Sequence, residues 1–252
     1  MSALRFLYYY LWIAPHVLQV VILFAMVQRR LHERFRMFFL YTGFEVLQFA
    51  LLFSVRQFLT ITQQQFFLLL TIGLTASTVL RFGIIYEVFL ELCRAYPALK
   101  NLLGVLFGRT ALALLLTAAV LAALTPGNGI YRFRFVVSVF DTSFSIVQCG
   151  LLLFLFLFSR YFALSWRQSV FGIALGFGVY ASVELASSAL RSQILPGTHL
   201  FDYLAMATYH CCVLVWLFYI LASAQEPRLI VQKLPGHDLE TWNQELQRLL
   251  HQ

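Results

Sequence analysis

Several charged side chains interrupt apolar stretches of the sequence, where a charge is costly. Ionisable groups inside a lipid bilayer usually face the interior of a helix bundle, where they pair, bind ions or relay protons. The side chains of this kind are Glu45, Arg56, Arg81, Glu87, Arg109, Asp141 and Glu184. Paired carboxyls in such a place can bind a proton, a cation or an amine, so they are the first candidates for a functional site.

Helical spacing places some of these groups on continuous polar rows. Residues three or four apart share one face of a helix. One such row is Tyr41, Glu45, Gln48, Leu52 and Arg56, and another is Ser138, Asp141, Ser145 and Gln148. A third row contains Gly172, Gly176, Tyr180, Glu184 and Ser188. The small Gly172–Gly176 pair allows close approach of another helix, so Glu184 is predicted to lie on a packed face.

Depth in the bilayer suggests which of these groups could meet. At a rise of ~1.5 Å per residue, Glu45 and Arg81 lie about 12–16 Å from the predicted cytoplasmic edge, and they are candidates for a buried ion pair. Asp141 and Glu184 lie about 9 Å from the outer edge, and as neighbours they would form an acidic pair with one proton retained. Arg56 lies near enough in depth to neutralise that pair instead. Equally, these groups could serve only to fix helix packing and register.

Metal and cofactor sites have little support. His16 and His210 fall near mid-depth in the first and last apolar stretches, and two facing histidines can ligate a haem iron. Hydrogen-bonded core histidines are the preferred interpretation, so we expect no metal and no cofactor. The four cysteines include no CxxC pair, and they imply neither disulfides nor zinc.

Catalytic motifs are equally scarce. The sequence contains no HExxH, no GxSxG, no P-loop and no GxGxxG. The only lysines, Lys100 and Lys233, lie outside the predicted spans, which excludes a retinal Schiff base in the last helix. An intramembrane enzyme is therefore the least supported class.

Composition identifies the elements that must position these groups. Hydrophobic residues make up 61% of the 252 positions and charged residues 12%, against roughly 25% charged in soluble domains. A membrane helix needs about 20 apolar residues. The sequence predicts an all-α bundle of about seven membrane helices within residues 1–224, at 6–28, 37–59, 66–92, 101–124, 135–158, 169–190 and 200–222.

The loops predict the orientation of the bundle, because cytoplasmic loops carry an excess of Lys and Arg. On one side are Arg29, Arg30, Arg34, Arg36, Arg94, Lys100, Arg160, Arg167, Arg228, Lys233 and Arg248, and on the other are Arg5, Arg132, Arg134 and Arg191. This bias predicts an external N-terminus and a cytoplasmic tail at 225–252. An amphipathic helix predicted at 238–250 would pack on the bundle or on a protein partner. The basic loops explain the net charge of +7 without nucleic acid.

One stretch carries a resemblance to other proteins. The segment QCGLLLFLFLFSRYFALSWRQSVFGIALGFG, at 148–178, resembles seven-helix proteins of bacterial inner membranes that have no assigned activity. The chain is also similar in outline to seven-helix sensor modules that precede signalling domains. The resemblance implies a multi-pass protein of the bacterial inner membrane and brings no ligand with it.

Three functional hypotheses follow. The first is a module that senses a small ligand or signal, with its site among the second, third, fifth and sixth spans. The second is a proton- or ion-coupled transporter, because intramembrane carboxyls suit proton coupling. The third is a structural subunit or assembly factor of a larger membrane complex.

Overall fold

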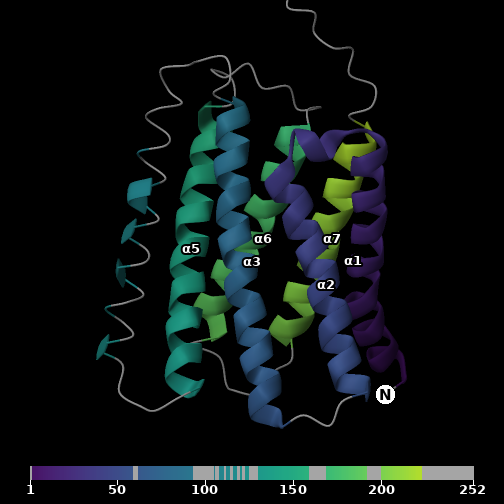
Figure 1. Ribbon diagram of the computed structural model, residues 1–252, viewed down its shortest axis with the longest axis vertical. Helices are drawn as coiled ribbons and strands as arrows, with labels where there is room; N and C mark the ends of the chain where they lie inside the picture. Colours follow the sequence, from purple (N-terminus) through teal and green to yellow (C-terminus); the bar gives the residue numbers. More distant parts are fainter. Residues whose placement is uncertain are drawn as a thin grey trace, which may run out of the picture.

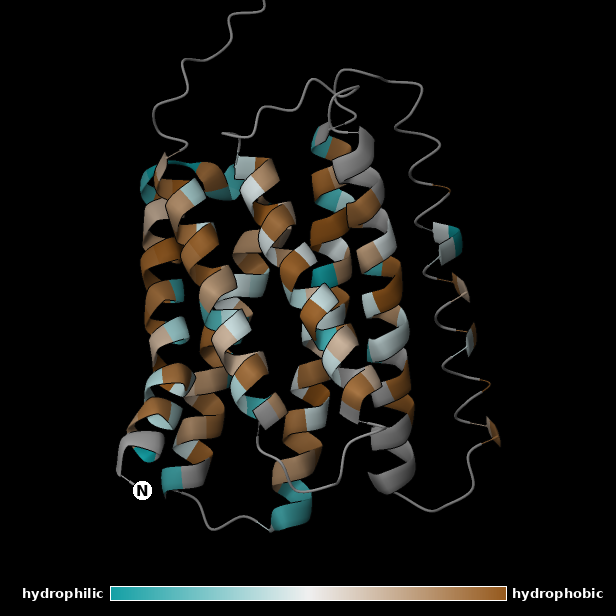
Figure 2. Ribbon diagram, turned by 180° about the vertical axis from the view of Figure 1, so that it is seen from behind, coloured by the Kyte–Doolittle hydropathy of each residue, from teal (hydrophilic) through white to brown (hydrophobic). Residues whose placement is uncertain are grey.

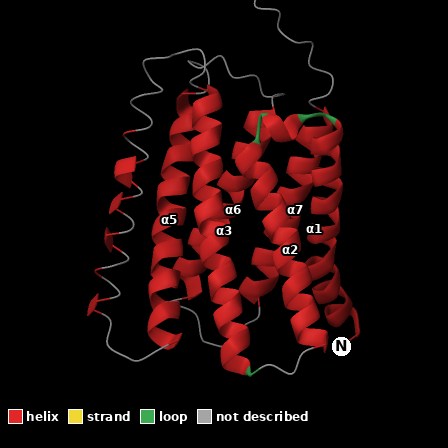
Figure 3. Ribbon diagram, in the orientation of Figure 1, coloured by secondary structure: helices red, strands yellow, loops and turns green. Residues whose placement is uncertain are grey.

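The computed structural model is helical throughout the residues that it describes, which are 2–58, 62–92, 130–158, 169–191, 200–222 and short helical pieces between 105 and 124. Figure 3 shows no strand in this part of the chain. The main elements are α1 (Ser2–Gln28), the 3-10 turn η1 (Leu31–Glu33), α2 (Arg36–Phe58), α3 (Gln63–Leu92), α5 (Ile130–Phe158), α6 (Ser169–Arg191) and α7 (Leu200–Ala222). Most of the predicted fourth span and the whole tail at 225–252 lie outside the described residues.

Five helices, α1, α2, α3, α6 and α7, are long and apolar enough to cross a membrane. Figure 2 shows apolar residues along most of their length. Large apolar side chains also point outward, for example Leu47 with 70% and Phe218 with 66% of the side chain exposed. Exposed apolar surface on this scale suits contact with lipid rather than with water. The predicted all-helical fold is therefore confirmed for the described residues, and the five long apolar helices fit a multi-pass membrane protein.

The helices pack side by side into a bundle, in which most neighbours are antiparallel and the pairs α1–α7 and α3–α5 are parallel. Helix α1 packs against both α2 and α7, α3 packs against α2, α5 and α6, and α6 packs against both α5 and α7. Figure 1 shows the first residues of α1, α3, α5 and α7 at one end, together with the last residues of α2 and α6. We call this the N-terminal end of the bundle.

Two side chains tie helices together at the opposite end by capping helix termini. The Glu87 carboxylate on α3 accepts hydrogen bonds from the backbone N–H groups of Met37, at 3.1 Å, and Phe38, at 3.3 Å, in the first turn of α2. The first turn of a helix has unpaired N–H groups and a partial positive charge, so a carboxylate stabilises it. Arg29, at the end of α1, donates to the carbonyls of Ile220 and Leu221 at the end of α7.

Beside Glu87, the Glu91 carboxylate forms an ion pair with Arg34 at 2.8 Å. Glu87 and Glu91 thus fix the connection between α1 and α2 against α3.

An aromatic cluster fills the centre of the bundle between α2, α6 and α7. The Trp216 ring lies 4.7 Å from the Phe177 ring and 5.3 Å from the Phe38 ring, centroid to centroid. Its indole N–H donates to the Ile173 carbonyl at 3.3 Å, so the buried polar atom is satisfied.

Glycines make room for this packing. A Cβ atom on Gly176 would lie 2.2 Å from Trp216 Nε1, and one on Gly172 would lie 2.1 Å from Tyr219 Cγ. Both glycines thus lie where α7 presses aromatic rings onto α6, whereas Glu184, further along α6, faces α3 and α5.

Gly176→Ala should destabilise the protein, because the added methyl group collides with a ring that cannot move without disturbing the cluster. Overpacking of this kind costs about 1–3 kcal/mol. The matched control is Gly43→Ala in α2, where a Cβ atom meets nothing within 4 Å. Thermal unfolding in detergent should show a lower Tm for the first variant and no loss for the second, and equal Tm values would contradict the packing described here.

Candidate functional site

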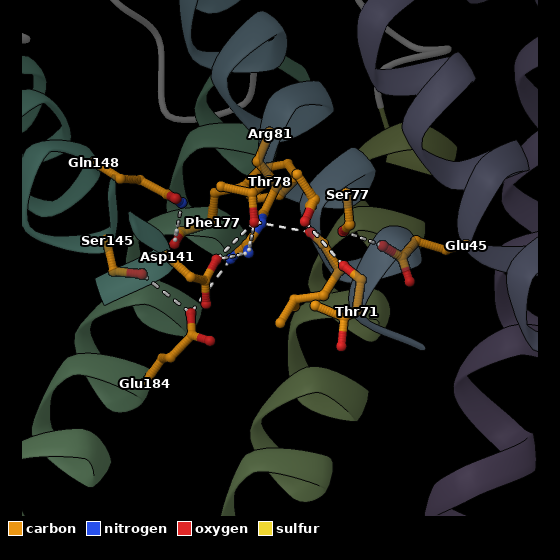
Figure 4. Close-up of polar contacts among 12 residues, drawn as sticks. Glu45, Thr71, Ser77, Thr78, Arg81, Asp141, Ser145, Gln148, Phe177 and Glu184 are labelled. Atoms are coloured by element: carbon orange, nitrogen blue, oxygen red, sulfur yellow. Dashed lines mark hydrogen bonds and ion pairs between the residues drawn. The ribbon is translucent and has the colours of Figure 1, made fainter. Parts of the chain in front are cut away.

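Arg81 in α3 is the centre of a buried charge cluster. Its side chain is 3% exposed, and its Nη2 lies 2.6 Å from Asp141 Oδ1 on α5. Its Nη1 lies 3.3 Å from Glu184 Oε2 on α6. Figure 4 shows the guanidinium directed toward these two carboxylates. One side chain therefore joins three helices through charge-assisted hydrogen bonds.

Hydroxyl groups hold the same carboxylate oxygens in place. Thr78, one turn before Arg81, donates to Asp141 Oδ1 at 2.7 Å and accepts from Arg81 Nη2 at 3.0 Å. Ser145, one turn after Asp141, donates to Glu184 Oε2 at 3.2 Å. These bonds fix the carboxylates relative to the guanidinium, as a preorganised site requires.

The charges of the cluster do not cancel. One guanidinium faces two carboxylates, so the formal charge of the group is one negative when all three are ionised. An uncompensated buried charge is costly, and a proton or a bound cation would remove it. The rings of Phe144 and Tyr180 lie 5.7 Å from the Arg81 guanidinium carbon, where their faces further stabilise its positive charge.

A cavity of about 380 Å³ opens beside the cluster, between α3, α5, α6 and α7. Its polar lining includes Thr71, Asp141, Thr142, Ser145, Glu184 and Thr208. The Glu184 side chain is 29% exposed and that of Asp141 is 12% exposed. The Asp141 and Glu184 carboxyl groups also approach each other closely enough to share a proton. Within the described residues no other group donates to their second oxygens, so these oxygens are available to a ligand that displaces this proton.

This cavity, which we call the acidic cavity, lies toward the N-terminal end of the bundle. Its α3 residues, Leu70, Thr71 and Leu74, come from the first half of that helix, and its α6 residues reach Ser187 near the end of α6. Both stretches are close to the N-terminal end in Figure 1.

The structure corrects the predicted pairing of Glu45 with Arg81. Glu45 accepts a short hydrogen bond from the Ser77 hydroxyl, while Arg81 pairs with Asp141 and Glu184. Successive residues of a helix are about 100° apart. Ser77 therefore faces α2, whereas Thr78 and the Arg81 guanidinium face α5, and Figure 4 shows Glu45 on the far side of α3.

The structure does bring the predicted acidic residues Asp141 and Glu184 together, and Arg81 neutralises them in part.

Arg56 lies in α2, and its side chain is outside the described part of the chain. The buried Gln148 donates through Nε2 to the Phe177 carbonyl at 3.0 Å, so it ties α5 to α6. Gln148 does not line the acidic cavity.

The two histidines have separate surroundings. The His16 ring stacks on Phe49 with centroids 4.1 Å apart, and its Nδ1 lies 2.9 Å from the Trp12 carbonyl oxygen. His210 Nε2 lies 3.4 Å from the Tyr10 hydroxyl. Among the described residues no group of three or more His, Cys, Asp or Glu side chains is placed to hold a metal ion.

Of the hydroxyls that complete the charge cluster, Ser145 was part of a predicted polar row, whereas Thr78 was not singled out in the sequence. Thr71, Thr75 and Thr78 recur at steps of four and three on α3, and Arg81 continues that row. The spacing argument that identified the rows around Glu45 and Asp141 would have found this row as well.

Comparison with known proteins gives no relative: no protein-family model matches the chain, and neither a curated protein nor a solved structure is significantly similar to it. The resemblance carried by residues 148–178 therefore stays a prediction.

Arg81→Met should destabilise the protein strongly, because it leaves two buried carboxylates without their counter-charge. Removing one partner of a buried ion pair costs about 3–5 kcal/mol. The triple variant Arg81→Met, Asp141→Asn, Glu184→Gln should recover much of that loss, and Arg5→Gln at the exposed start of α1 should behave like the natural protein. Thermal unfolding would measure all four proteins, and a triple variant less stable than Arg81→Met would contradict this account of the cluster.

Proposed function

We propose that the protein is a ligand-sensing membrane module that binds a small, positively charged ligand in the acidic cavity. The observation that carries the proposal is the imbalance of charge at this cavity, where Arg81 compensates only one of the two carboxylates. An ammonium group would supply the missing charge and donate to the unoccupied oxygens of Asp141 and Glu184.

In this proposal seven helices span the membrane with the N-terminus outside and the tail in the cytoplasm, in a bacterial inner membrane. The acidic cavity would then be reached from the external side, because it lies toward the N-terminal end. The tail helix at 238–250, outside the described residues, would pass the bound state to a protein partner. The absence of catalytic motifs from the sequence favours binding over chemistry.

The way the cluster joins three helices supports a sensing role. Asp141 is on α5, Glu184 on α6 and Arg81 on α3, so a cation that draws the carboxylates toward itself weakens their bonds to Arg81. Such a ligand would differ in affinity between two arrangements of these helices, which is what a conformational signal requires.

Gently solubilised protein should retain a small cationic molecule that Glu184→Gln and Asp141→Asn variants lose. Native mass spectrometry of the intact protein measures the mass of the retained molecule directly. The matched control is Glu33→Gln, which removes an exposed carboxylate on η1 and should leave retention unchanged. A natural protein that carries only lipid, or retention that survives in both site variants, would overturn the proposal.

A proton-coupled transporter is the second candidate, and the same charge imbalance favours it, because a proton shared by Asp141 and Glu184 neutralises the cluster as well as a cation does. Proteoliposomes containing a pH-sensitive dye would then show proton uptake that depends on the protein and is abolished by Asp141→Asn. Absence of proton movement, together with ligand retention, would leave sensing as the function.

A further inference from the structure

A second cavity, of about 320 Å³, adjoins the acidic cavity and lies between α1, α2, α3, α6 and α7. Its lining differs in chemistry from that of the acidic cavity, because several aromatic rings border it. The rings belong to Trp12, His16, Tyr41, Tyr180 and Tyr209, and one carboxylate, Glu45, lies among them. We call it the aromatic cavity.

The Glu45 carboxylate has no ion-pair partner within the described residues. One of its oxygens accepts from Ser77, and no described donor bonds the other. Arg81 also borders the aromatic cavity, but both of its terminal nitrogens are engaged by Asp141 and Glu184. The negative charge of Glu45 is therefore available to a ligand.

A second acceptor accompanies Glu45 one turn along α2. Gln48 also lines the cavity, and its Oε1 is buried without a hydrogen-bond partner. Buried acceptors left unpaired are costly, so a ligand that donates to Gln48 Oε1 would be favoured here. The buried Arg81 Nε–H also has no hydrogen-bond partner among the described residues, but its guanidinium is already paired with two carboxylates. A neutral apolar ligand would leave the Gln48 acceptor unpaired, and an anion would be repelled by Glu45.

Neighbouring contacts hold the rings of the cavity in position. The His16 ring is stacked on Phe49, and the Tyr209 hydroxyl accepts from Gln19 Nε2 at 2.6 Å. The Tyr209 ring lies 5.8 Å from the Tyr180 ring and 6.3 Å from the His16 ring, centroid to centroid. Aromatic faces fixed around a single carboxylate attract an ammonium ion whose methyl groups can pack on the rings.

We propose that the aromatic cavity is a separate binding site for an alkylated organic ammonium ion, paired with Glu45 and enclosed by the rings of Trp12, Tyr41 and Tyr209. A bare metal ion fits less well, because hard cations need six or more oxygen ligands and rings supply none. This site does not depend on ligand binding in the acidic cavity, whose lining of hydroxyls and aliphatic side chains suits a compact hydrogen-bond donor instead.

The test is isothermal titration of the full chain in nanodiscs with tetramethylammonium chloride, at constant ionic strength maintained with sodium chloride. Saturable binding is expected, with affinity about tenfold or more weaker in Glu45→Gln, since a desolvated cation loses its counter-charge. The neutral isostere tert-butyl alcohol should bind the natural protein at least about tenfold more weakly than tetramethylammonium for the same reason. Glu33→Gln, the exposed control, should bind like the natural protein.

Two further variants keep the proposal falsifiable if Glu45→Gln fails to fold. Trp12→Leu removes one ring face and should weaken binding, whereas Phe218→Leu removes an exposed ring of α7 outside the cavity and should leave binding unchanged. Asp141→Asn should also retain tetramethylammonium binding, which separates this site from the acidic cavity. Two outcomes would overturn the proposal. One is the absence of saturable tetramethylammonium binding to the natural protein. The other is an affinity that decreases in Asp141→Asn but not in the Glu45 and Trp12 variants.

Discussion

The buried guanidinium of Arg81 imposes the constraint on which the rest of the bundle depends. A positive charge with 3% of its side chain exposed needs counter-charges within hydrogen-bonding distance, and these come from α5 and α6. Helices α3, α5 and α6 must therefore pack in a register that brings Asp141 and Glu184 to one point. The hydroxyls of Thr78 and Ser145 and the rings of Phe144 and Tyr180 complete the surroundings that make the charge tolerable.

The remaining packing serves that register. Glycines at 172 and 176 let the aromatic side chains of α7 press onto α6. At the end opposite the N-terminus, Glu87 and Arg29 satisfy the unpaired backbone groups of α2 and α7. Helices α2, α3, α1 and α7 are thus fixed at that end, while the acidic cavity lies toward the other.

Two adjoining cavities of different chemistry border helix α3. The acidic cavity has two carboxylates and a row of hydroxyls, and the aromatic cavity has one carboxylate and several rings. Both are bordered by Leu70, Leu74, Tyr180 and Ala205, so a ligand in one adjoins the wall of the other. Of the two cavities, Arg81 borders the aromatic one, whereas its counter-charges Asp141 and Glu184 line the acidic one. A shift of the Arg81 side chain would therefore change the surroundings of both cavities.

The sequence by itself predicted the helical fold, and five of the seven predicted spans match helices long and apolar enough to cross a membrane. Apolar length and the three-to-four spacing of polar groups are local properties. Interruption of apolar stretches identified Glu45, Arg81, Asp141 and Glu184 before any contact was known, although the same argument also selected Arg109, which is exposed. Only the tertiary structure decided which of these groups meet. Depth estimates joined Arg81 to Glu45, whereas the angular position of Arg81 around α3 and the length of its side chain join it to Asp141 and Glu184. Depth along a helix follows from counting residues, but the rotation of each helix about its own axis follows from packing against its neighbours, and that rotation decides which charge finds which partner.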